Sequence, residues 1–123
     1  MTVRIALLSM ALASGVSLAA GRAMAGSCPG GPAPNHAVVH GPVLEIPDAS
    51  SLCIAQGQSP STWLRVRLAR ASDTLPLLMA AAFGKNAVCN VGADGRGICD
   101  IEGRPLEEEL RRPETIAASL GWR

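Results

Sequence analysis

Aromatic side chains are scarce in this chain. Its 123 residues include no tyrosine, one phenylalanine and two tryptophans. Proteins that bind single-stranded nucleic acid stack the bases on aromatic rings, so the composition argues against specific nucleic-acid recognition and leaves Trp63 as a single stacking platform. The formal net charge is only +1, which excludes a general nucleic-acid coat, because such a coat requires a strongly basic surface.

The sequence also lacks a Cys-x-x-Cys motif. It has four scattered cysteines, at Cys28, Cys53, Cys89 and Cys99. An even number of cysteines in a small exported domain is typical of a disulfide framework, and a zinc site is the less favoured alternative. Cys89 and Cys99 flank a glycine-containing turn symmetrically and are predicted to pair across a hairpin. This leaves Cys28 to pair with Cys53.

Long apolar runs are confined to the first 25 residues. Arg4 is followed by an apolar stretch over residues 5–20 and by a small-x-small cleavage site, AMA, at residues 23–25. This pattern predicts a signal peptide over residues 1–25. An uncleaved membrane anchor is the rival, but the run is short and contains serines. We expect an exported protein, periplasmic or secreted, with no membrane contact after cleavage.

The remaining 98 residues suffice for one small domain and carry nine basic and ten acidic residues. Residues 26–35, GSCPGGPAPN, predict an extended arm that a bonded Cys28 would tie down. A domain over residues 36–123 follows. It begins with a strand over residues 36–46 that is broken or bulged at Pro42, because proline has no N–H to donate.

Two strands follow, at residues 50–56 and 62–69, joined by a loop rich in Gly, Ser and Pro. In the second of these strands every other residue is apolar, so one face is predicted to be buried and the other to be cationic. The predicted buried residues are Leu64, Val66 and Leu68, and the predicted outer residues are Trp63, Arg65 and Arg67.

The second half of the chain predicts helices around a hairpin. Asp73 or Thr74 can cap an apolar helix over residues 75–83, and Asp94-Gly95 predicts a turn between strands at 86–91 and 97–101. Helices are predicted at 105–112 and 114–120, interrupted by Pro113. This order of elements predicts a mainly β protein with helices: a five-stranded OB-fold barrel with a C-terminal helical cap.

Several motifs resemble the staphylococcal nuclease (thermonuclease) family. Residues 48–54, DASSLCI, match that family's Asp-Gly-Asp-Thr motif and the apolar residues after it, and residues 66–69, VRLA, match the Arg-Leu end of a later strand. Cys89, Gly95-Arg96, Cys99 and the segment GRPL at 103–106 follow the family's order. The resemblance covers roughly residues 43–122 and implies the same OB-fold barrel.

The resemblance also assigns roles to individual residues. It implies that Asp48 corresponds to the first aspartate of the family motif and that Arg67 and Arg96 bind phosphate and assist catalysis. Ser50 stands where the family has a second aspartate, Ser72 replaces a further calcium ligand and Leu75 replaces the general base. Asp73 lies one position from Ser72, where the family has a calcium ligand, and is a candidate metal residue together with Asp48.

Since the catalytic carboxylates are largely lost, we expect a non-catalytic binding or interaction module, a pseudoenzyme, with an unknown protein partner or a weak phosphate or nucleic-acid ligand. The predicted ligand surface consists of Trp63, Arg65, Arg67 and Arg96, although exposed arginines are often simply solvated or paired with acids. The alternative is a weak calcium-dependent nuclease that uses Asp48, Asp73, Arg67 and Arg96. No cofactor is expected unless that alternative holds, in which case it is calcium.

Overall fold

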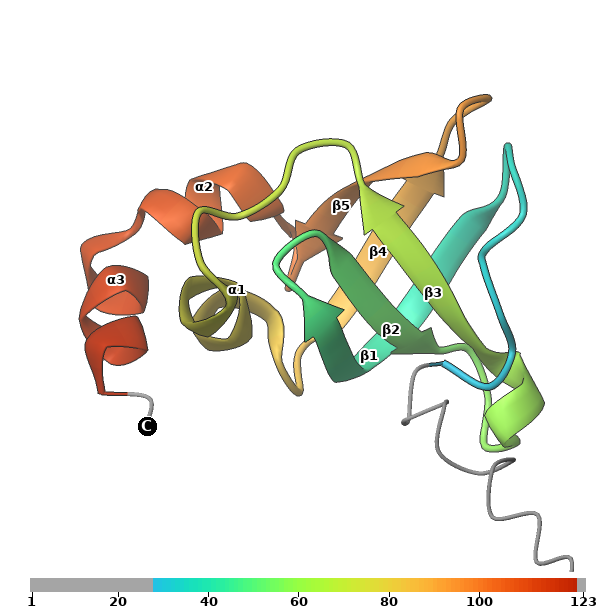
Figure 1. Ribbon diagram of the computed structural model, residues 1–123, viewed down its shortest axis with the longest axis horizontal. Helices are drawn as coiled ribbons and strands as arrows, with labels where there is room; N and C mark the ends of the chain where they lie inside the picture. Colours follow the sequence, from blue (N-terminus) through green and yellow to red (C-terminus); the bar gives the residue numbers. More distant parts are fainter. Residues whose placement is uncertain (1–27, 122–123) are drawn as a thin grey trace, which may run out of the picture.

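The computed structural model describes residues 28–121, so the predicted signal peptide and residues 26–27 of the predicted arm lie outside the described residues. Within that range the chain forms a β-barrel with three helices gathered on one side of it (Figure 1). The strands are β1 (Val38–Asp48), β2 (Ser51–Ala55), β3 (Trp63–Leu68), β4 (Asn86–Val91), β5 (Arg96–Ile101) and the short β6 (Arg104–Pro105). The helices are α1 (Leu75–Ala82), α2 (Leu106–Arg111) and α3 (Pro113–Leu120).

The barrel closes through one parallel contact. The strands lie in the order β3-β2-β1-β4-β5 with antiparallel neighbours, and β3 also pairs in parallel with β5. Helix α1 connects β3 to β4. This closed mixed barrel followed by C-terminal helices is consistent with an OB-like fold, so the predicted fold class is confirmed.

Strand β1 is long because it belongs to both halves of the barrel. It pairs with β4 from Val38 to Pro42 and with β2 from Val43 onward. Gly41 precedes the change of partner with φ +150°, and a Cβ there would collide with the carbonyl oxygen of Ala55. Glycine is therefore required at this crossing. The sequence predicted a break or bulge at Pro42, but the strand runs through Pro42 and the register irregularities lie between Val43 and Asp48.

The core forms from the inward-facing residues of the strands and from α1. In β3, Val66 and Leu68 are buried, Leu64 is half-buried, and Arg65 and Arg67 are exposed, as the alternation predicted. Helix α1 begins at Leu75, with the Thr74 hydroxyl accepting a hydrogen bond from the Leu77 N–H at 3.2 Å. It contributes three buried residues to the core: Leu78, Ala81 and Ala82.

The extended arm lies alongside β3. Its backbone forms a parallel bridge at Pro32 with Arg65. Three hydrogen bonds join the two segments: Gly30 N–H to Trp63 O (3.0 Å), Arg65 N–H to Gly31 O (2.8 Å) and Ala33 N–H to Arg65 O (2.8 Å). The arm therefore pairs with the first half of β3, whereas β5 pairs with the last two residues of β3, Arg67 and Leu68.

Both predicted disulfides are present. Cys28 of the arm is bonded to Cys53 of β2, and both residues are buried. Cys89 and Cys99 are register partners across β4 and β5 and form the second bond. Two disulfides indicate an oxidising environment, such as the periplasm or the outside of the cell.

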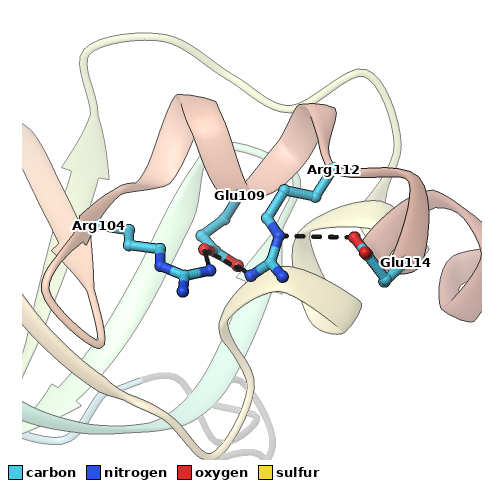
Figure 2. A network of polar contacts seen from close by, with 4 residues as sticks. All are labelled: Arg104, Glu109, Arg112 and Glu114. Atoms are coloured by element: carbon cyan, nitrogen blue, oxygen red, sulfur yellow. Dashed lines mark hydrogen bonds and ion pairs between the residues drawn. The ribbon is translucent and has the colours of Figure 1, made fainter.

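An ion-pair network holds the helical cap together (Figure 2). Glu109 of α2 is buried, and its Oε1 lies 3.2 Å from Arg112 Nη1 and 3.5 Å from Arg104 Nη1. Arg112 separates α2 from α3, and its Nε lies 3.5 Å from Glu114 Oε2 at the start of α3. Glu109 thus links α2 to β6 through Arg104, and Arg112 extends the network to α3 through Glu114. Among residues 28–121 no helix is long and apolar enough to cross a membrane.

Candidate functional site

Three predicted ligand-binding arginines lie on β3 and β5. Arg65 and Arg67 are exposed on the outer face of β3, and Arg96 is exposed at the start of β5. Arg67 and Arg96 are register partners in the parallel contact that closes the barrel. Adjacent strands are about 4.8 Å apart, so the Cα atoms of these two residues are neighbours across the parallel contact and both side chains leave the sheet at the same place. The structure thus brings Arg67 and Arg96 together as register partners, with Arg65 two residues earlier on β3.

The hairpin turn fixes the position of Arg96. The Asp94 carboxylate accepts a hydrogen bond from the Arg96 N–H at 3.0 Å, and Gly92 N–H donates to Arg96 O at 2.9 Å. Gly95 occupies a left-handed conformation with φ +80°, which glycine adopts without steric cost. The turn therefore starts β5 in the register that faces Arg67.

Arg67 and Arg96 belong to no ion pair within the described part of the chain. Like charges directly opposite one another on neighbouring strands are destabilising. The two side chains therefore carry a mutual repulsion that an anion between them would remove. Guanidinium groups donate hydrogen bonds in a fork that matches phosphate oxygens, so a phosphate is a suitable partner.

Trp63 lies at the opposite end of β3 from Arg67. Its indole Nε1–H donates to Gly57 O at 3.1 Å, and the side chain is half-buried. The indole donor is thus used to hold the loop before β3. The structure therefore brings Trp63 near Arg65 along the strand but not to the contact between Arg67 and Arg96.

Asp48 stabilises the turn between β1 and β2. Its Oδ1 accepts hydrogen bonds from the Ser50 N–H and the Ser50 hydroxyl, both at 2.8 Å. The backbone hydrogen bond from Ser50 is the main cause that lowers the pKa of Asp48, and hydroxyl hydrogen bonds and the positive charge of Arg65 act in the same direction. The Asp48 carboxylate thus serves the β1–β2 turn through its hydrogen bonds with Ser50.

Asp73 lies in the loop before α1. That loop contacts the β1–β2 turn, because the Ser72 N–H donates to Ala49 O at 2.8 Å, so the segments that carry Asp73 and Asp48 are adjacent. Ser72 is buried and its hydroxyl donates to Thr74 O at 2.9 Å. Its side chain therefore stabilises the loop.

The residues present do not fit the calcium site implied by the resemblance. Residues 28–121 contain no group of three His, Cys, Asp or Glu side chains placed to hold a metal ion. The Asp48 carboxylate already accepts two hydrogen bonds on one oxygen, and Ser50 and Leu75 provide no carboxylate. Calcium prefers six to eight oxygen ligands with several carboxylates, which is more than these residues provide.

The sequence did not indicate the hollows beside the arginine pair. A cleft of about 390 Å³ opens between the end of β3, β5 and the start of α2, and Leu68, Ala69 and Ile98 help to line it. A neighbouring hollow of about 310 Å³ is lined by Arg96 and Asp94 and shares Ala69 and Ile98 with the cleft. No local pattern identifies such a cleft, because its walls come from segments up to 40 residues apart.

No protein-family model, curated protein or solved structure matches this chain. The link to the staphylococcal nuclease family therefore rests on the residues that suggested it: the motifs around Asp48 and Arg67, the spacing of Cys89, Arg96 and Cys99, and the order of elements. It remains a hypothesis, and function has to be argued from the site itself.

Proposed function

We propose that this protein is an exported, non-catalytic binding module of staphylococcal-nuclease type that takes an anionic, phosphate-bearing ligand through Arg67 and Arg96. The observation that carries the proposal is the register pairing of these two residues at the closure of the barrel. Both are exposed, and within residues 28–121 neither takes part in an ion pair. Two guanidinium groups without an ion-pair partner, carried by paired residues of the sheet, can bind one phosphate together.

Arg65 lies near Arg67 and Arg96 but is not one of the two residues to which we assign the ligand. It lies two residues before Arg67 on the same face of β3, and its charge acts on Asp48. Arg65 thus acts on Asp48, whereas the guanidinium groups of Arg67 and Arg96 form no ion pair within residues 28–121. We therefore assign the ligand contacts to Arg67 and Arg96 and a secondary electrostatic role to Arg65.

Export is the second part of the proposal. It is supported by the two disulfides, which require an oxidising compartment, and by the signal-like sequence of residues 1–25. Expression with the native N-terminus in a bacterial host, followed by N-terminal sequencing of the periplasmic fraction, should give a chain that begins at Gly26. Recovery of the intact chain in the membrane fraction would instead support an uncleaved anchor.

Binding can be measured on the oxidised protein purified after export. Titration with inorganic phosphate and pyrophosphate, followed by NMR, should shift the backbone signals of Arg67, Arg96 and Gly97. A hydrogen bond to a charged group contributes about 1.5–3 kcal/mol, so Arg67→Ala or Arg96→Ala should weaken binding at least tenfold. The matched control is Arg111→Ala, which removes an exposed arginine of α2. Equal loss in all three variants would show that only net charge matters and would refute the proposed site.

The alternative is a weak calcium-dependent nuclease that uses Asp48 and Asp73 with the two arginines. Cleavage of single-stranded DNA should be assayed with added calcium and with a chelator, using Arg96→Ala as control. We expect no cleavage in either condition, because the described residues offer calcium too few carboxylates. Calcium-dependent cleavage that disappears in the Arg96 variant would replace the binding proposal by the nuclease.

A further inference from the structure

The cleft beside the arginine pair has mainly apolar walls. Its lining includes Leu68 and Ala69 from the end of β3, Ile98 from β5, and Pro105 and Leu106 where α2 begins. Its volume of about 390 Å³ falls within the usual range for small-molecule sites, about 300–1,000 Å³. The cleft is thus large enough for part of a small ligand.

The cleft adjoins the smaller hollow that Arg96 lines, and Arg67 is the register partner of Arg96 but lines neither of them. Leu68 and Gly97 directly follow Arg67 and Arg96, and these two residues are also register partners. Successive side chains of a strand point to opposite faces, so Leu68 and Gly97 face inward, whereas Ile98, which lines the cleft, is exposed on the same face of β5 as Arg96. The smaller hollow that contains Arg96 shares Ala69 and Ile98 with the cleft. One ligand can therefore contact both.

The residues that line the cleft determine which non-phosphate part of the ligand can bind there. No aromatic residue lines the cleft or the neighbouring hollow that contains Arg96. Bases bind single-strand sites by stacking on aromatic rings, whereas aliphatic side chains bury aliphatic groups without geometric preference. The cleft is therefore suited to an aliphatic group and poorly suited to a nucleobase.

We propose that the site binds an amphiphilic organic phosphate, with the phosphate on Arg67 and Arg96 and a short aliphatic chain in the cleft. This inference rests on the proposed anion site and adds the class of ligand. Charge complementarity places the headgroup, because the two arginines have no ion-pair partner in the described part of the chain. At the α2 side the cleft is bounded by Arg70 and Glu107, whose ion pair of 3.7 Å is largely exposed.

Affinity should depend on chain length. The experiment titrates the oxidised protein purified after export with inorganic phosphate, methyl, butyl and hexyl phosphate, and a mononucleotide, using calorimetry or NMR. Each buried methylene should strengthen binding about fourfold, equivalent to about 0.8 kcal/mol, until the cleft is filled. The mononucleotide should bind no more tightly than methyl phosphate.

Two variants at matched exposed positions separate the cleft from the anion site. Ile98→Ser removes an apolar wall at a residue that is 71% exposed, and Val88→Ser makes the same type of change at a 45% exposed residue of β4 outside the cleft. Ile98→Ser should abolish the dependence on chain length but retain binding of inorganic phosphate. Val88→Ser should change neither.

The results also separate this inference from the function on which it rests. Binding of inorganic phosphate without any gain from butyl or hexyl phosphate would overturn the role of the cleft and leave the anion site intact. A mononucleotide that binds more tightly than the alkyl phosphates would overturn the aliphatic specificity. If no phosphate binds at all, both the anion site and the ligand class are wrong.

Discussion

Replacing Glu109 by glutamine removes the charge at the centre of the helical cap and keeps the length of the side chain. The Glu109 side chain is 5% exposed, with two arginine nitrogens 3.2 and 3.5 Å from its Oε1. Figure 2 shows both guanidinium groups converging on this carboxylate. Glutamine preserves the packing but leaves Arg104 and Arg112 without their shared acid.

The expected loss of stability lies between two known limits. Exposed ion pairs contribute about 0–1 kcal/mol, and breaking a fully buried pair costs about 3–5 kcal/mol. Here the acid is buried but the side chains of Arg104 and Arg112 are 54% and 37% exposed, so water screens the charges that remain. We expect a loss of about 1.5 kcal/mol. For a domain of this size that corresponds to a fall in Tm of about 6–12 °C.

Thermal unfolding followed by circular dichroism measures this effect. The control is Glu107→Gln, because Glu107 lies on the same helix but forms only an exposed ion pair with Arg70 at 3.7 Å. That control should lower Tm by less than about 4 °C. A Glu109→Gln protein that unfolds within about 2 °C of the wild type, or together with the Glu107 variant, would refute the role given to the buried network.

Three further substitutions test other parts of the structure. Asp48→Asn should make the free energy of unfolding fall less steeply at acidic pH. Hydrogen bonds lower the pKa of Asp48 in the fold, so its contribution to stability is present above the unfolded pKa and is lost as the pH falls below about 4. Urea unfolding at several pH values measures this, and the same loss of unfolding free energy at acidic pH in the wild type and the variant would contradict it. Arg96→Gln should raise Tm at low ionic strength by relieving the repulsion with Arg67, and the gain should shrink in about 1 M salt, where the Debye length is about 3 Å; a gain independent of salt would contradict it. Replacing Cys28 and Cys53 by serine opens a loop of 25 residues, which should cost about 3 kcal/mol in denaturant unfolding, and an unchanged midpoint would exclude that contribution.

The barrel could be predicted because its determinants are local. Alternating residues in β3, the Asp94-Gly95 turn and the Thr74 cap each specify a short segment, and their order leaves few topologies. Cys89 and Cys99 follow from the same hairpin register. The change of partner along β1 was not predicted: the sequence indicated a break or bulge at Pro42, whereas the strand runs through Pro42, and Gly41 is required by the carbonyl of Ala55, which no neighbouring residue in the sequence reveals.

The site was only partly predictable. Arg67 and Arg96 were identified by resemblance, and the barrel closure brings them together. The use of Asp48 in a turn, the indole hydrogen bond of Trp63 and the burial of Glu109 all depend on contacts formed by the fold. Glu109 in particular belongs to a run of three glutamates, and sequence alone does not show which one faces inward.

The arm beside β3 has a consequence for solubility. The backbone of Trp63 and Arg65 would otherwise present unpaired donors and acceptors at a strand edge, which is a template for edge-to-edge association of copies. Residues 30–33 occupy those groups with three hydrogen bonds, and glycines and prolines in this segment have little tendency to recruit another strand. Residues 28–35, held by the Cys28–Cys53 disulfide, thus cover this part of the strand edge, so we expect reduction of that bond to expose it to other chains as well as to weaken the fold.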